Sequence, residues 1–404
     1  MWSADSSSFH IPAQWYQDPY PVYRFLRETP IHAVPAGGGS WLFPRYADCH
    51  ALLRDPRLSA QRAQTLVSHL APAAQQEFAW FTALFANMLP LLDGAAHRKW
   101  RRHLRHAFET TALRKLAPGT AASVESWVEG ARQQGCIEIM QTLAIPLPSQ
   151  VICELVGVPP ALRADVLRLS RLMAAFVADL HAQVEVARRA QHSAKELHLL
   201  LRDVFLRCRA CPGDDLISEL APLVRRDSSE EEDLLAQCMI LLVTGHETTS
   251  GLLANCLLSL LTHRAQWRLL QREPSLVDQA VEETLRYESP AQYVTRVATE
   301  DLRLHGQSVQ RGQPLVLLLG SANRDTSHFK EPDRFDITRQ DNRHLAFGHG
   351  VHHCLGAHLA RMEARIALAT FLRCFPNAQL DREVSWMEHL GLRAPRELFL
   401  RVHG

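Results

Sequence analysis

The residues best suited to chemistry lie near the C-terminal end, in the segment FGHGVHHCLGAHLAR at positions 347–361. A single cysteine, Cys354, stands there among glycines and histidines, just before a run that has the pattern of a helix. Glycines at this density indicate unusual backbone angles or a close approach of the chain to another group. At the start of a helix, backbone N–H groups and the helix dipole stabilise a thiolate.

Several roles for Cys354 fit these observations. A buried structural cysteine would behave as a small hydrophobe, but it would leave Gly348, Gly350 and Gly356 unexplained. A structural zinc site takes paired ligands from two places, and the sequence offers no suitable partner pair. A nucleophile needs a base and an oxyanion hole, and the sequence marks neither. An axial ligand to haem iron needs a held thiolate beside a large planar group, which fits the remaining features.

A second chemical cluster, GHETTS at 245–250, interrupts a long apolar segment. It is not the HExxH motif of zinc proteases, because Ser250 stands where that motif requires histidine. Polar side chains buried in the middle of a helix need partners or a purpose. Gly245 weakens the helix, and the hydroxyls of Thr248 and Thr249 can bond back to carbonyl groups, so we expect local opening there.

The elements that must position these residues are mainly helical. The segment from about 229 to 262 is apolar on nearly every side, which predicts a buried helix roughly 45 Å long. Ser228 and Ser229 can cap its start, and the acidic residues 230–233 suit its first turn. Amphipathic periodicity predicts further helices at 97–108, 120–134, 148–156, 160–182 and 184–209.

Strand patterns are fewer and shorter than helical ones. They occur at 40–46, 293–299, 302–320 and 398–402. The polar segment 326–346 has no clear periodicity and predicts a long functional loop. No repeat or linker divides the chain, so we expect a mainly α fold with a smaller β-rich region, forming one domain over residues 1–404.

Composition narrows the possible classes of protein. The 404 residues are 47% hydrophobic and 22% charged, with a net charge of +1, which gives no reason to expect nucleic acid as a partner. The start lacks the features of a signal peptide, and no apolar run approaches the ~20 residues of a membrane span. We therefore expect a cytoplasmic protein without a membrane partner. Nine scattered cysteines indicate reduced thiols, and we interpret the lone CxxC, Cys208 and Cys211, as structurally neutral.

The cysteine segment resembles the signature of the cytochrome P-450 superfamily, Phe-Gly-x-Gly-x-His-x-Cys-x-Gly, at every specified position. The resemblance implies that Cys354 ligates haem iron, that Phe347 packs beside the thiolate and that His352 lies near a haem propionate. Gly356, the last glycine of the signature, belongs to the same cofactor-binding set. The implied fold is that of the cytochromes P-450, with a long central helix over the haem, and the implied class is the soluble bacterial one.

The cluster GHETTS is similar to the oxygen-binding groove of that family. The resemblance implies that Glu247 and Thr248 act in catalysis by relaying protons, which is general-acid work through ordered water. Thr244 departs from the family pattern, which usually has Ala or Gly before the glycine. Its hydroxyl leaves the detailed proton route open.

Cations for the haem carboxylates are also implied by the resemblance. His97 and Arg101 match the family's His-x-x-x-Arg propionate site, and they lie one turn apart on a predicted helix. Arg296 matches the strand arginine that has the same task. The usual Asp-Pro-Pro before the histidine is replaced by DGAAH, so the preceding loop is expected to differ in shape.

Three further residues are expected to have a structural role. Glu283 and Arg286 match the family's Glu-x-x-Arg pair, and Arg334, in PDRF, occupies the place of the third partner. A carboxylate shared between two arginines would tie the helix to the long loop.

The implied function is that of a monooxygenase, which uses haem b (iron protoporphyrin IX) to insert one oxygen atom from O2 into an apolar small molecule. Hydroxylation of a secondary metabolite fits, with electrons from NAD(P)H through a ferredoxin-type partner and its reductase. Epoxidation, desaturation and oxidative coupling stay open, because they share the same oxidant. A non-catalytic haem sensor is disfavoured by the retention of Glu247 and Thr248.

Two surfaces follow from the same resemblance. The redox partner is expected to dock on the cysteine side, at a basic patch that we define as Arg98, Lys99, Arg102, Arg105, His349, His353 and Arg365. About half of the aromatic side chains in 76–92 are expected to be plain core. The residues expected to line an apolar substrate pocket are Phe85, Met88, Ile240, Val243, Thr244, Tyr293 and Val294.

Overall fold

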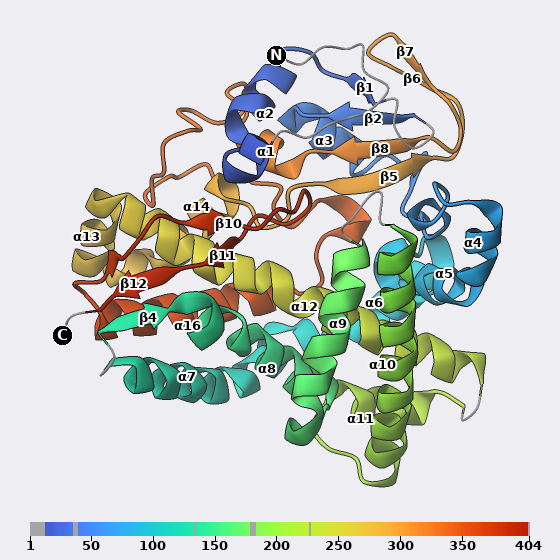
Figure 1. Ribbon diagram of the computed structural model, residues 1–404, viewed down its shortest axis with the longest axis horizontal. Coiled ribbons are helices and arrows are strands. Elements are labelled where there is room, and N and C mark those ends of the chain that lie inside the picture. Colours follow the sequence, from blue (N-terminus) through green and yellow to red (C-terminus); the bar gives the residue numbers. More distant parts are fainter. Residues whose placement is uncertain (1–12, 35–38, 133–134, 178–182, 226–227, 403–404) are drawn as a thin grey trace.

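The computed structural model describes residues 13–34, 39–132, 135–177, 183–225 and 228–402. Helices make up most of the molecule, and the largest sheet lies at one side of it, together with the N-terminal helices (Figure 1). The prediction of a mainly α fold with a smaller β-rich region is therefore confirmed. The helices are α1 Ala13–Gln17, α2 Tyr20–Leu26, α3 Tyr46–Leu52, α4 Pro72–Glu77, α5 Ala79–Ala86, α6 Gly94–Arg105, α7 Thr110–Arg132, α8 Pro146–Val156, α9 Arg163–Val177, α10 Val184–Ala210, α11 Leu216–Leu220, α12 Ser229–Thr262, α13 Arg264–Arg272, α14 Val277–Tyr287, α15 Leu319–Ala322 and α16 Ala357–Cys374.

The strands form one sheet of five and three smaller sheets. In the large sheet the order is β1-β2-β8-β5-β3, and only the β2–β8 pair is parallel. The strands are β1 His32–Val34, β2 Ser40–Phe43, β3 Leu58–Ser59, β4 Cys136–Glu138, β5 Val294–Ala298, β6 Leu302–Leu304, β7 Gln307–Val309, β8 Pro314–Leu317, β9 Gln379–Leu380, β10 Ser385–Trp386, β11 Pro395–Glu397 and β12 Phe399–Arg401.

The long buried helix predicted at 229–262 is α12, and it runs through the middle of the molecule (Figure 1). The Ser228 hydroxyl accepts a hydrogen bond from the backbone N–H of Glu231 at 3.4 Å, as expected of a cap. The helix is continuous past Gly245, so the predicted local opening is wrong. A Cβ atom at Gly245 would lie 2.7 Å from Cγ1 of Ile152. This glycine therefore serves the close packing of α12 on α8.

Other predicted helices differ mainly at their ends. The helix predicted at 120–134 is α7, which begins earlier, at Thr110. Pro118 lies inside this helix and does not mark its start. The helix predicted at 160–182 is α9, which starts at Arg163, and the end of that prediction lies outside the described residues. Residues 1–12, which are part of the start that lacks the features of a signal peptide, also lie outside the described residues.

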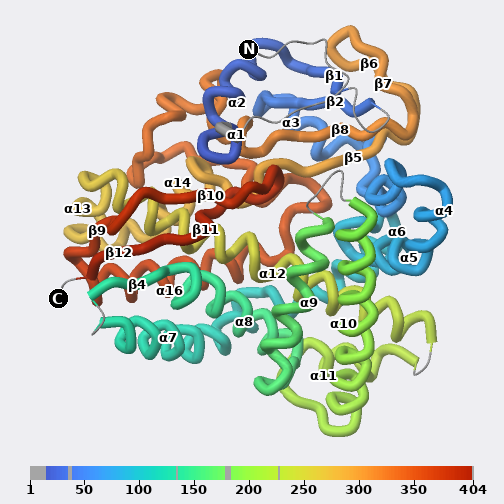
Figure 2. The backbone as a smooth tube through the Cα atoms, in the orientation of Figure 1, coloured from blue at the N-terminus to red at the C-terminus, as the bar shows by residue number. Residues whose placement is uncertain are grey.

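The C-terminal strand joins distant parts of the chain. β12 pairs antiparallel with β4, which places Leu400 opposite Ile137, and it pairs with β9 on its other edge. The tube view shows this red segment beside the turquoise one (Figure 2). Most buried hydrophobic residues form one large cluster across the helices, and two smaller clusters lie against the five-stranded sheet. Within the described residues, no helix is both long and apolar enough to cross a bilayer.

Candidate active site

The loop around Cys354 is a compact turn that leads into α16. The backbone N–H of Cys354 donates to the carbonyl of Phe347 at 2.9 Å, which closes the turn. Gly348 and Gly350 have φ angles of +67° and +76°, so the unusual backbone angles predicted for them are present. A Cβ at Gly350 would also lie 2.8 Å from the carbonyl oxygen of Leu53. Gly356 has an ordinary φ of −82°, so its backbone does not require glycine.

The Cys354 side chain has free surface, although it lies deep inside the protein. It is exposed, yet burial raises the pKa of its thiol. A deep side chain with free surface faces an internal space rather than bulk solvent. The backbone N–H of Gly356 and the guanidinium groups of Arg101 and Arg361 act in the opposite direction and favour the thiolate. The donor groups around the sulfur are therefore those of a thiolate ligand.

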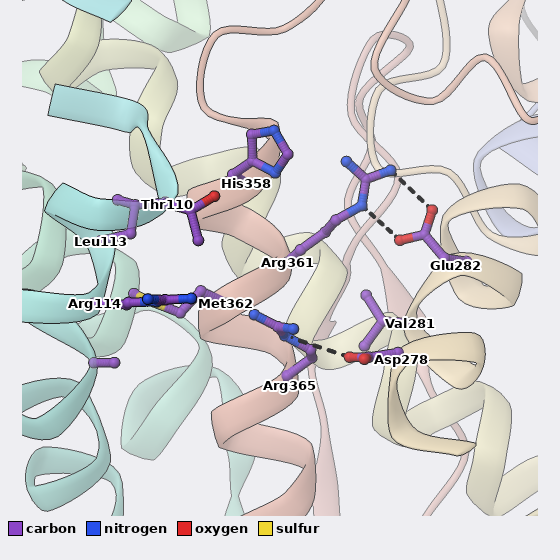
Figure 3. Close-up of a pocket in the computed structure, with 11 residues that line it drawn as sticks. Thr110, Leu113, Arg114, Asp278, Val281, Glu282, His358, Arg361, Met362 and Arg365 are labelled. Atoms are coloured by element: carbon purple, nitrogen blue, oxygen red, sulfur yellow. Dashed lines mark hydrogen bonds and ion pairs between the residues drawn. The ribbon is translucent and has the colours of Figure 1, made fainter. Parts of the chain in front are cut away.

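Phe347 is fixed by the first turns of α16. The guanidinium of Arg361 lies over its ring, 4.5 Å from the centroid, and forms a bidentate ion pair with Glu282 at 2.6 and 2.8 Å. The same ion pair lines a cavity of about 530 Å³ between α7, α14 and α16, in which Arg365 also faces Asp278 (Figure 3). This cavity contains neither Cys354 nor any of the residues predicted to line the substrate pocket.

In the middle of α12, Thr244 and Thr248 are exposed, and Glu247 is partly buried. The two threonines lie one turn apart on the same helix face, whereas most of the helix around them is buried. The Thr244 hydroxyl, which departs from the family pattern, donates a hydrogen bond to the carbonyl of Ile240 at 2.7 Å. It is thus directed back to its own helix. The Thr248 hydroxyl donates to the carbonyl of Thr244 at 3.4 Å. The weak second bond leaves the Thr248 hydroxyl able to bind another group.

Glu247 is adjacent to this face and is largely buried. Burial raises the pKa of its carboxyl group to about 7, against the opposing charge of Arg171 on α9. The pKa of the neighbouring His246 is lowered to about 4 by burial, and its Nδ1 lies 2.8 Å from the carbonyl oxygen of Leu242. Glu247 is therefore able to hold and release a proton near neutral pH.

Two predicted propionate ligands, His97 and His352, lie side by side with ring centroids 4.3 Å apart. His97 comes from α6, and His352 comes from the turn before Cys354. His352 Nε2 lies 3.1 Å from Oδ1 of Asp93, which precedes α6. Burial, with the charge of a protonated His352, lowers the pKa of His97 to about 4. Its Nε2 is buried without a hydrogen-bond partner in the described structure, so this nitrogen is available to a bound group.

The two predicted arginines approach the same region from α6 and β5. Arg101 Nη2 donates to the carbonyl of His353 at 2.8 Å. Arg296 is buried, and its Nη1 donates to the carbonyl of Thr295 at 3.0 Å. Burial, followed by the charge of Arg62, lowers the pKa of Arg296 to about 10. Across the described ranges, neither Arg101 nor Arg296 forms an ion pair, so both charges are available to an anionic ligand.

Sequence reasoning missed two residues of this region, Asp93 and Arg62. Asp93 accepts hydrogen bonds from the Ser59 hydroxyl and from the Ala60 backbone, and so it holds the segment after β3 against α6. The sequence did mark Asp93, because this residue stands where the family motif has an aspartate. Arg62 gave no signal, because a single arginine in an irregular segment has no periodicity or motif.

The predicted pocket residues divide into two groups. Four are buried, namely Phe85, Met88, Ile240 and Val243. Three keep free surface, namely Thr244, Tyr293 and Val294. Phe85 packs edge-on against Phe81, with centroids 4.8 Å apart, and near Phe176. Phe85 and Met88 are 0% exposed, which agrees with the alternative that part of this aromatic segment is core.

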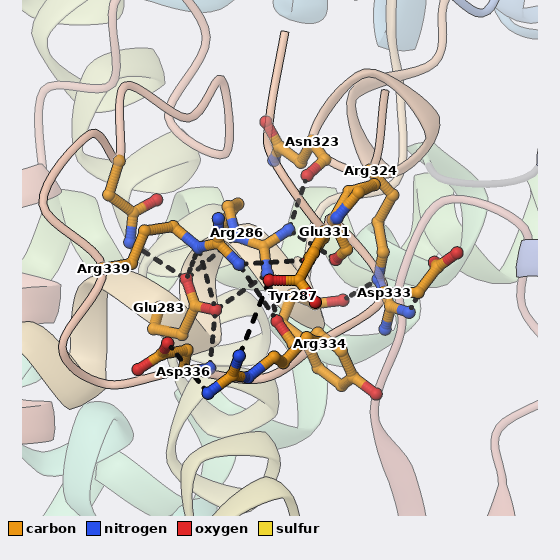
Figure 4. A network of polar contacts seen from close by, with 12 residues as sticks. Glu283, Arg286, Tyr287, Asn323, Arg324, Glu331, Asp333, Arg334, Asp336 and Arg339 are labelled. Carbon is orange, nitrogen blue, oxygen red and sulfur yellow. Dashed lines mark hydrogen bonds and ion pairs between the residues drawn. The ribbon is translucent and has the colours of Figure 1, made fainter. Parts of the chain in front are cut away.

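The Glu283–Arg286 pair is fully buried and forms the centre of a polar network (Figure 4). Arg286 donates to both carboxylate oxygens of Glu283 at 2.8 Å, and to the carbonyls of Asn323 and Pro332. The second arginine on that carboxylate is Arg339, whose Nε lies 3.1 Å from Oε2. Helix α14 is thereby tied to the long loop.

The prediction that Arg334 supplies the second guanidinium is wrong. Its side chain is 59% exposed and pairs with Glu331 and Asp336, at 3.5 and 3.6 Å. Only its backbone carbonyl enters the network, where it accepts bonds from Arg286 and Arg339 at 3.1 Å. The loop turns between the two arginines, so the motif position and the contact position differ by five residues.

The zinc alternative gains no support. Within the described residues, no three His, Cys, Asp or Glu side chains come together as a metal site. Cys208 and Cys211 are both free thiols at the end of α10.

Comparison with known proteins agrees with this geometry. The sequence profile of the family described as Cytochrome P450 matches residues 186–390. The chain is 36% identical to Vitamin D(3) 25-hydroxylase of Pseudonocardia autotrophica, over 91% of this chain and 88% of that one. It is 37% identical to the cytochrome P450 monooxygenase PikC of Streptomyces venezuelae, over 95% and 91%. The solved structure of P450BioI, bound to an acyl carrier protein that carries hexadec-9Z-enoic acid, matches with a TM-score of 0.90 at 31% identity, covering 97% of this chain and 100% of that one.

Proposed function

The chain belongs to the cytochrome P450 family and is a monooxygenase, and on that premise we propose that it hydroxylates an apolar secondary metabolite at a haem held by Cys354. The whole chain acts as one haem-thiolate domain in this proposal. The observation that carries it is the position of the Cys354 thiol, which has free surface inside the protein and is surrounded by groups that favour a thiolate. When bound, a haem with a thiolate ligand supplies the electron-rich centre at which dioxygen is activated.

The cations of this region fit the two carboxylates of such a cofactor. Arg101 and Arg296 carry charges without an ion-pair partner in the described chain, and His97 has a buried nitrogen without a partner. Buried charges and donors left in this way are costly unless a ligand satisfies them. We assign His97, Arg101, Arg296 and His352 to the propionates. We assign Phe347 and Gly356 to the face of the haem on which Cys354 lies.

Glu247 and Thr248 fit the proton-relay role. The pKa of Glu247 near 7 allows its carboxyl group to donate a proton and to recover it from solvent at physiological pH. The Thr248 hydroxyl has free surface, and its weak bond to the Thr244 carbonyl leaves it able to orient a water molecule. The protein's task here is to hold these groups in place and to deliver protons at the right position.

The substrate class is proposed from the name of a relative and from the residues predicted to line the pocket. One relative is named for the hydroxylation of vitamin D3, and four of the residues predicted to line the pocket, Phe85, Met88, Ile240 and Val243, are apolar and buried. A mainly apolar metabolite is therefore proposed, with O2 as co-substrate. In this proposal the electrons come from NAD(P)H through a ferredoxin-type partner and its reductase.

The test is the absorption spectrum of the reduced, carbon monoxide-bound protein. The red-shifted Soret band of thiolate-ligated haem is expected for the native chain, and its loss is expected for Cys354→His. Cys374→Ser, at a partly buried cysteine at the end of the same helix, is the matched control and keeps the band. A native protein that shows a histidine-like band overturns the proposal. Product analysis with candidate metabolites, a ferredoxin system and NADPH then separates hydroxylation from epoxidation or coupling.

A further inference from the structure

Phe347, which the proposed function assigns to the cysteine side of the haem, has a cation over its ring. The guanidinium of Arg361 lies 4.5 Å from the ring centroid, a distance at which a cation and an aromatic ring attract each other. The carbonyl of Phe347 also accepts the backbone N–H of Cys354 at 2.9 Å. A single residue therefore links the charge of Arg361 to Cys354.

That charge is balanced by Glu282 on α14. Nε and Nη2 of Arg361 donate to the two carboxylate oxygens at 2.6 and 2.8 Å. The two side chains are 28% and 32% exposed, so the pair is partly withdrawn from water. Against the effect of burial, the hydrogen bonds from Arg361 and His344 lower the pKa of Glu282 to about 2. Both partners are therefore charged at neutral pH.

His344 holds the same carboxylate without adding a charge. Its Nδ1 accepts the backbone N–H of Ala346 at 3.2 Å, so the ring hydrogen lies on Nε2, which is 3.2 Å from Oε2 of Glu282. A histidine with one accepting nitrogen is neutral. Among the residues that the structure describes, Arg361 is thus the one cation that balances Glu282.

A second ion pair on the wall of the same cavity provides a comparison. Arg365, one turn further along α16, faces Asp278 at 3.4 Å (Figure 3). Its side chains are 48% and 64% exposed, more than those of the first pair. In the described ranges no aromatic ring lies under the Arg365 guanidinium. Solvent screens such a pair more strongly, and it has no contact with Phe347.

Charges close to a thiolate-ligated haem affect how readily it is reduced. Reduction adds one electron, so a positive charge nearby favours the reduced state and a negative charge disfavours it. Groups behind the ligand, together with burial and hydrogen bonding, are the means by which a protein adjusts this potential. A balanced pair behind Phe347 keeps the local charge at zero, and loss of either partner would change it by one unit.

We propose that the Glu282–Arg361 ion pair sets the potential at which the haem accepts its first electron. The inference rests on the proposed function, which supplies the haem and the ferredoxin-type partner that donates the electron. One electron is gained by the haem and lost by the partner, and no bond forms or breaks. Glu282 and Arg361 are positioning residues, because they act from behind Phe347 and contact neither substrate nor oxygen.

The experiment measures the one-electron reduction potential of the haem-loaded enzyme by spectroelectrochemistry. Glu282→Gln leaves the guanidinium unbalanced and is expected to favour the reduced state about tenfold, a rise of ~59 mV for one electron. Arg361→Met leaves the carboxylate unbalanced, and a fall of similar size is expected. The double variant removes both charges, and its reduction equilibrium is expected to return to within about twofold of the native value.

The opposite signs separate this role from a merely structural one. A clamp that only holds α14 on α16 would be weakened in all three variants, so the potentials would move in one direction and the double variant would not recover. Single variants that shift the potential in the same direction therefore overturn the inference. A native potential in Glu282→Gln overturns it as well.

Two further variants serve as controls. Asp278→Asn, at the more exposed pair, is expected to change the reduction equilibrium by less than about twofold. A shift as large as that of Glu282→Gln would mean that any nearby surface charge has this effect, and would overturn the inference. Arg361→Lys keeps the charge and is expected to keep the potential close to native. If Arg361→Met does not retain haem, Glu282→Gln and Arg361→Lys decide.

The two proposals fail in different ways. A carbon monoxide spectrum without the thiolate band in the native chain rejects the proposed function, whatever the potentials are. A normal thiolate spectrum with equal potentials in the native enzyme and Glu282→Gln rejects only the role of the ion pair.

Discussion

Burial of Glu247 in the middle of α12 gives this single carboxyl group an effect on stability as well as on proton transfer. The group has a pKa of about 7 in the folded protein, against the ordinary value of 4.5. A carboxyl whose folded pKa is raised binds more protons in the folded than in the unfolded state between these two values. Stability is therefore lost as the pH rises from about 4.5 to about 7.

The prediction is that Glu247→Gln stabilises the protein at high pH and not at low pH. The gain in unfolding free energy over the native protein is expected to be on the order of 2–3 kcal/mol at pH 8, and much smaller at pH 5. Chemical denaturation at both pH values measures it. Glu129→Gln, at an exposed carboxyl of α7, is the control and shows no such pH dependence. Equal gains at pH 5 and pH 8 would contradict the assigned pKa.

Arg334 and Arg339 provide a second prediction for single residues. Arg339 donates to both oxygens of the buried Glu283 carboxylate, whereas the Arg334 side chain is exposed. Arg339→Ala removes partners of a buried charge and is expected to lower the unfolding free energy by about 1–3 kcal/mol. Arg334→Ala is expected to change it by no more than about 0.5 kcal/mol. A urea titration in which Arg334→Ala loses more unfolding free energy than Arg339→Ala would restore Arg334 as the partner of Glu283.

For single residues, a motif predicts the position of a side chain in the fold where the surrounding backbone is regular, and it fails where the backbone is irregular. Cys354 and Glu247 stand in a tight turn and in a helix, so that their sequence position determines their place. Arg334 was misassigned because the loop 326–346 has no period that relates position to contact. Arg62 was missed for the same reason, since it lies in the irregular segment that follows β3.

Among the elements, the packing of α12 on α8 depends on the absence of a side chain at Gly245. An added Cβ there would lie 2.7 Å from Cγ1 and 3.0 Å from Cδ1 of Ile152, closer than such atoms normally approach. Either the Ile152 side chain or one of the two helices would have to shift, and α12 carries Glu247 and Thr248. The glycine of GHETTS is thus required by helix packing rather than by helix opening.

Gly245→Ala is therefore expected to destabilise the protein by about 1–3 kcal/mol, as overpacking does. The control is Gly130→Ala in α7, where nothing lies within 4 Å of the added atom. That change is expected to stabilise the protein by about 0.5–1 kcal/mol, because alanine favours the helix. Denaturant unfolding measures both. In an Ile152→Ala background, Gly245→Ala should cost nothing further, and an undiminished cost there would refute the contact.

The sequence predicted long elements better than short ones. The long apolar run became α12 with its ends in place, and the strands near 293–299 and 302–320 became β5 to β8. The start of α7 was misplaced because Pro118 normally marks a helix end. Strands of two or three residues, such as β3 and β9, carry too few side chains for an alternating pattern. They exist because neighbouring strands supply their hydrogen bonds.

Over the whole molecule, the net charge of +1 conceals an uneven distribution of charge. Arg98 and Arg102 are exposed on one face of α6 and form no ion pair within the described chain. Arg105 follows on the same face, but it pairs with Glu109 at 3.3 Å. Helix α6 also contacts the cysteine loop through the bond from Arg101 to the His353 carbonyl. This part of the basic patch is therefore suited to attract an acidic redox partner to the cysteine side.

The last prediction is that Arg102→Glu slows electron transfer from a ferredoxin more than Arg105→Glu does. At low salt the Debye length is about 30 Å and unpaired charges steer association, so a ~10-fold loss is expected for Arg102→Glu. The loss for Arg105→Glu is smaller, because Glu109 already offsets part of that charge. Stopped-flow reduction of the haem-loaded enzyme at low and at physiological ionic strength measures both rates. Arg303→Glu on the β6–β7 hairpin, away from α6 (Figure 1), is the control and leaves the rate unchanged. Equal rates for the native enzyme and Arg102→Glu at low salt would place the docking surface elsewhere. At physiological ionic strength the rates of the three variants are expected to converge, because salt screens surface charges.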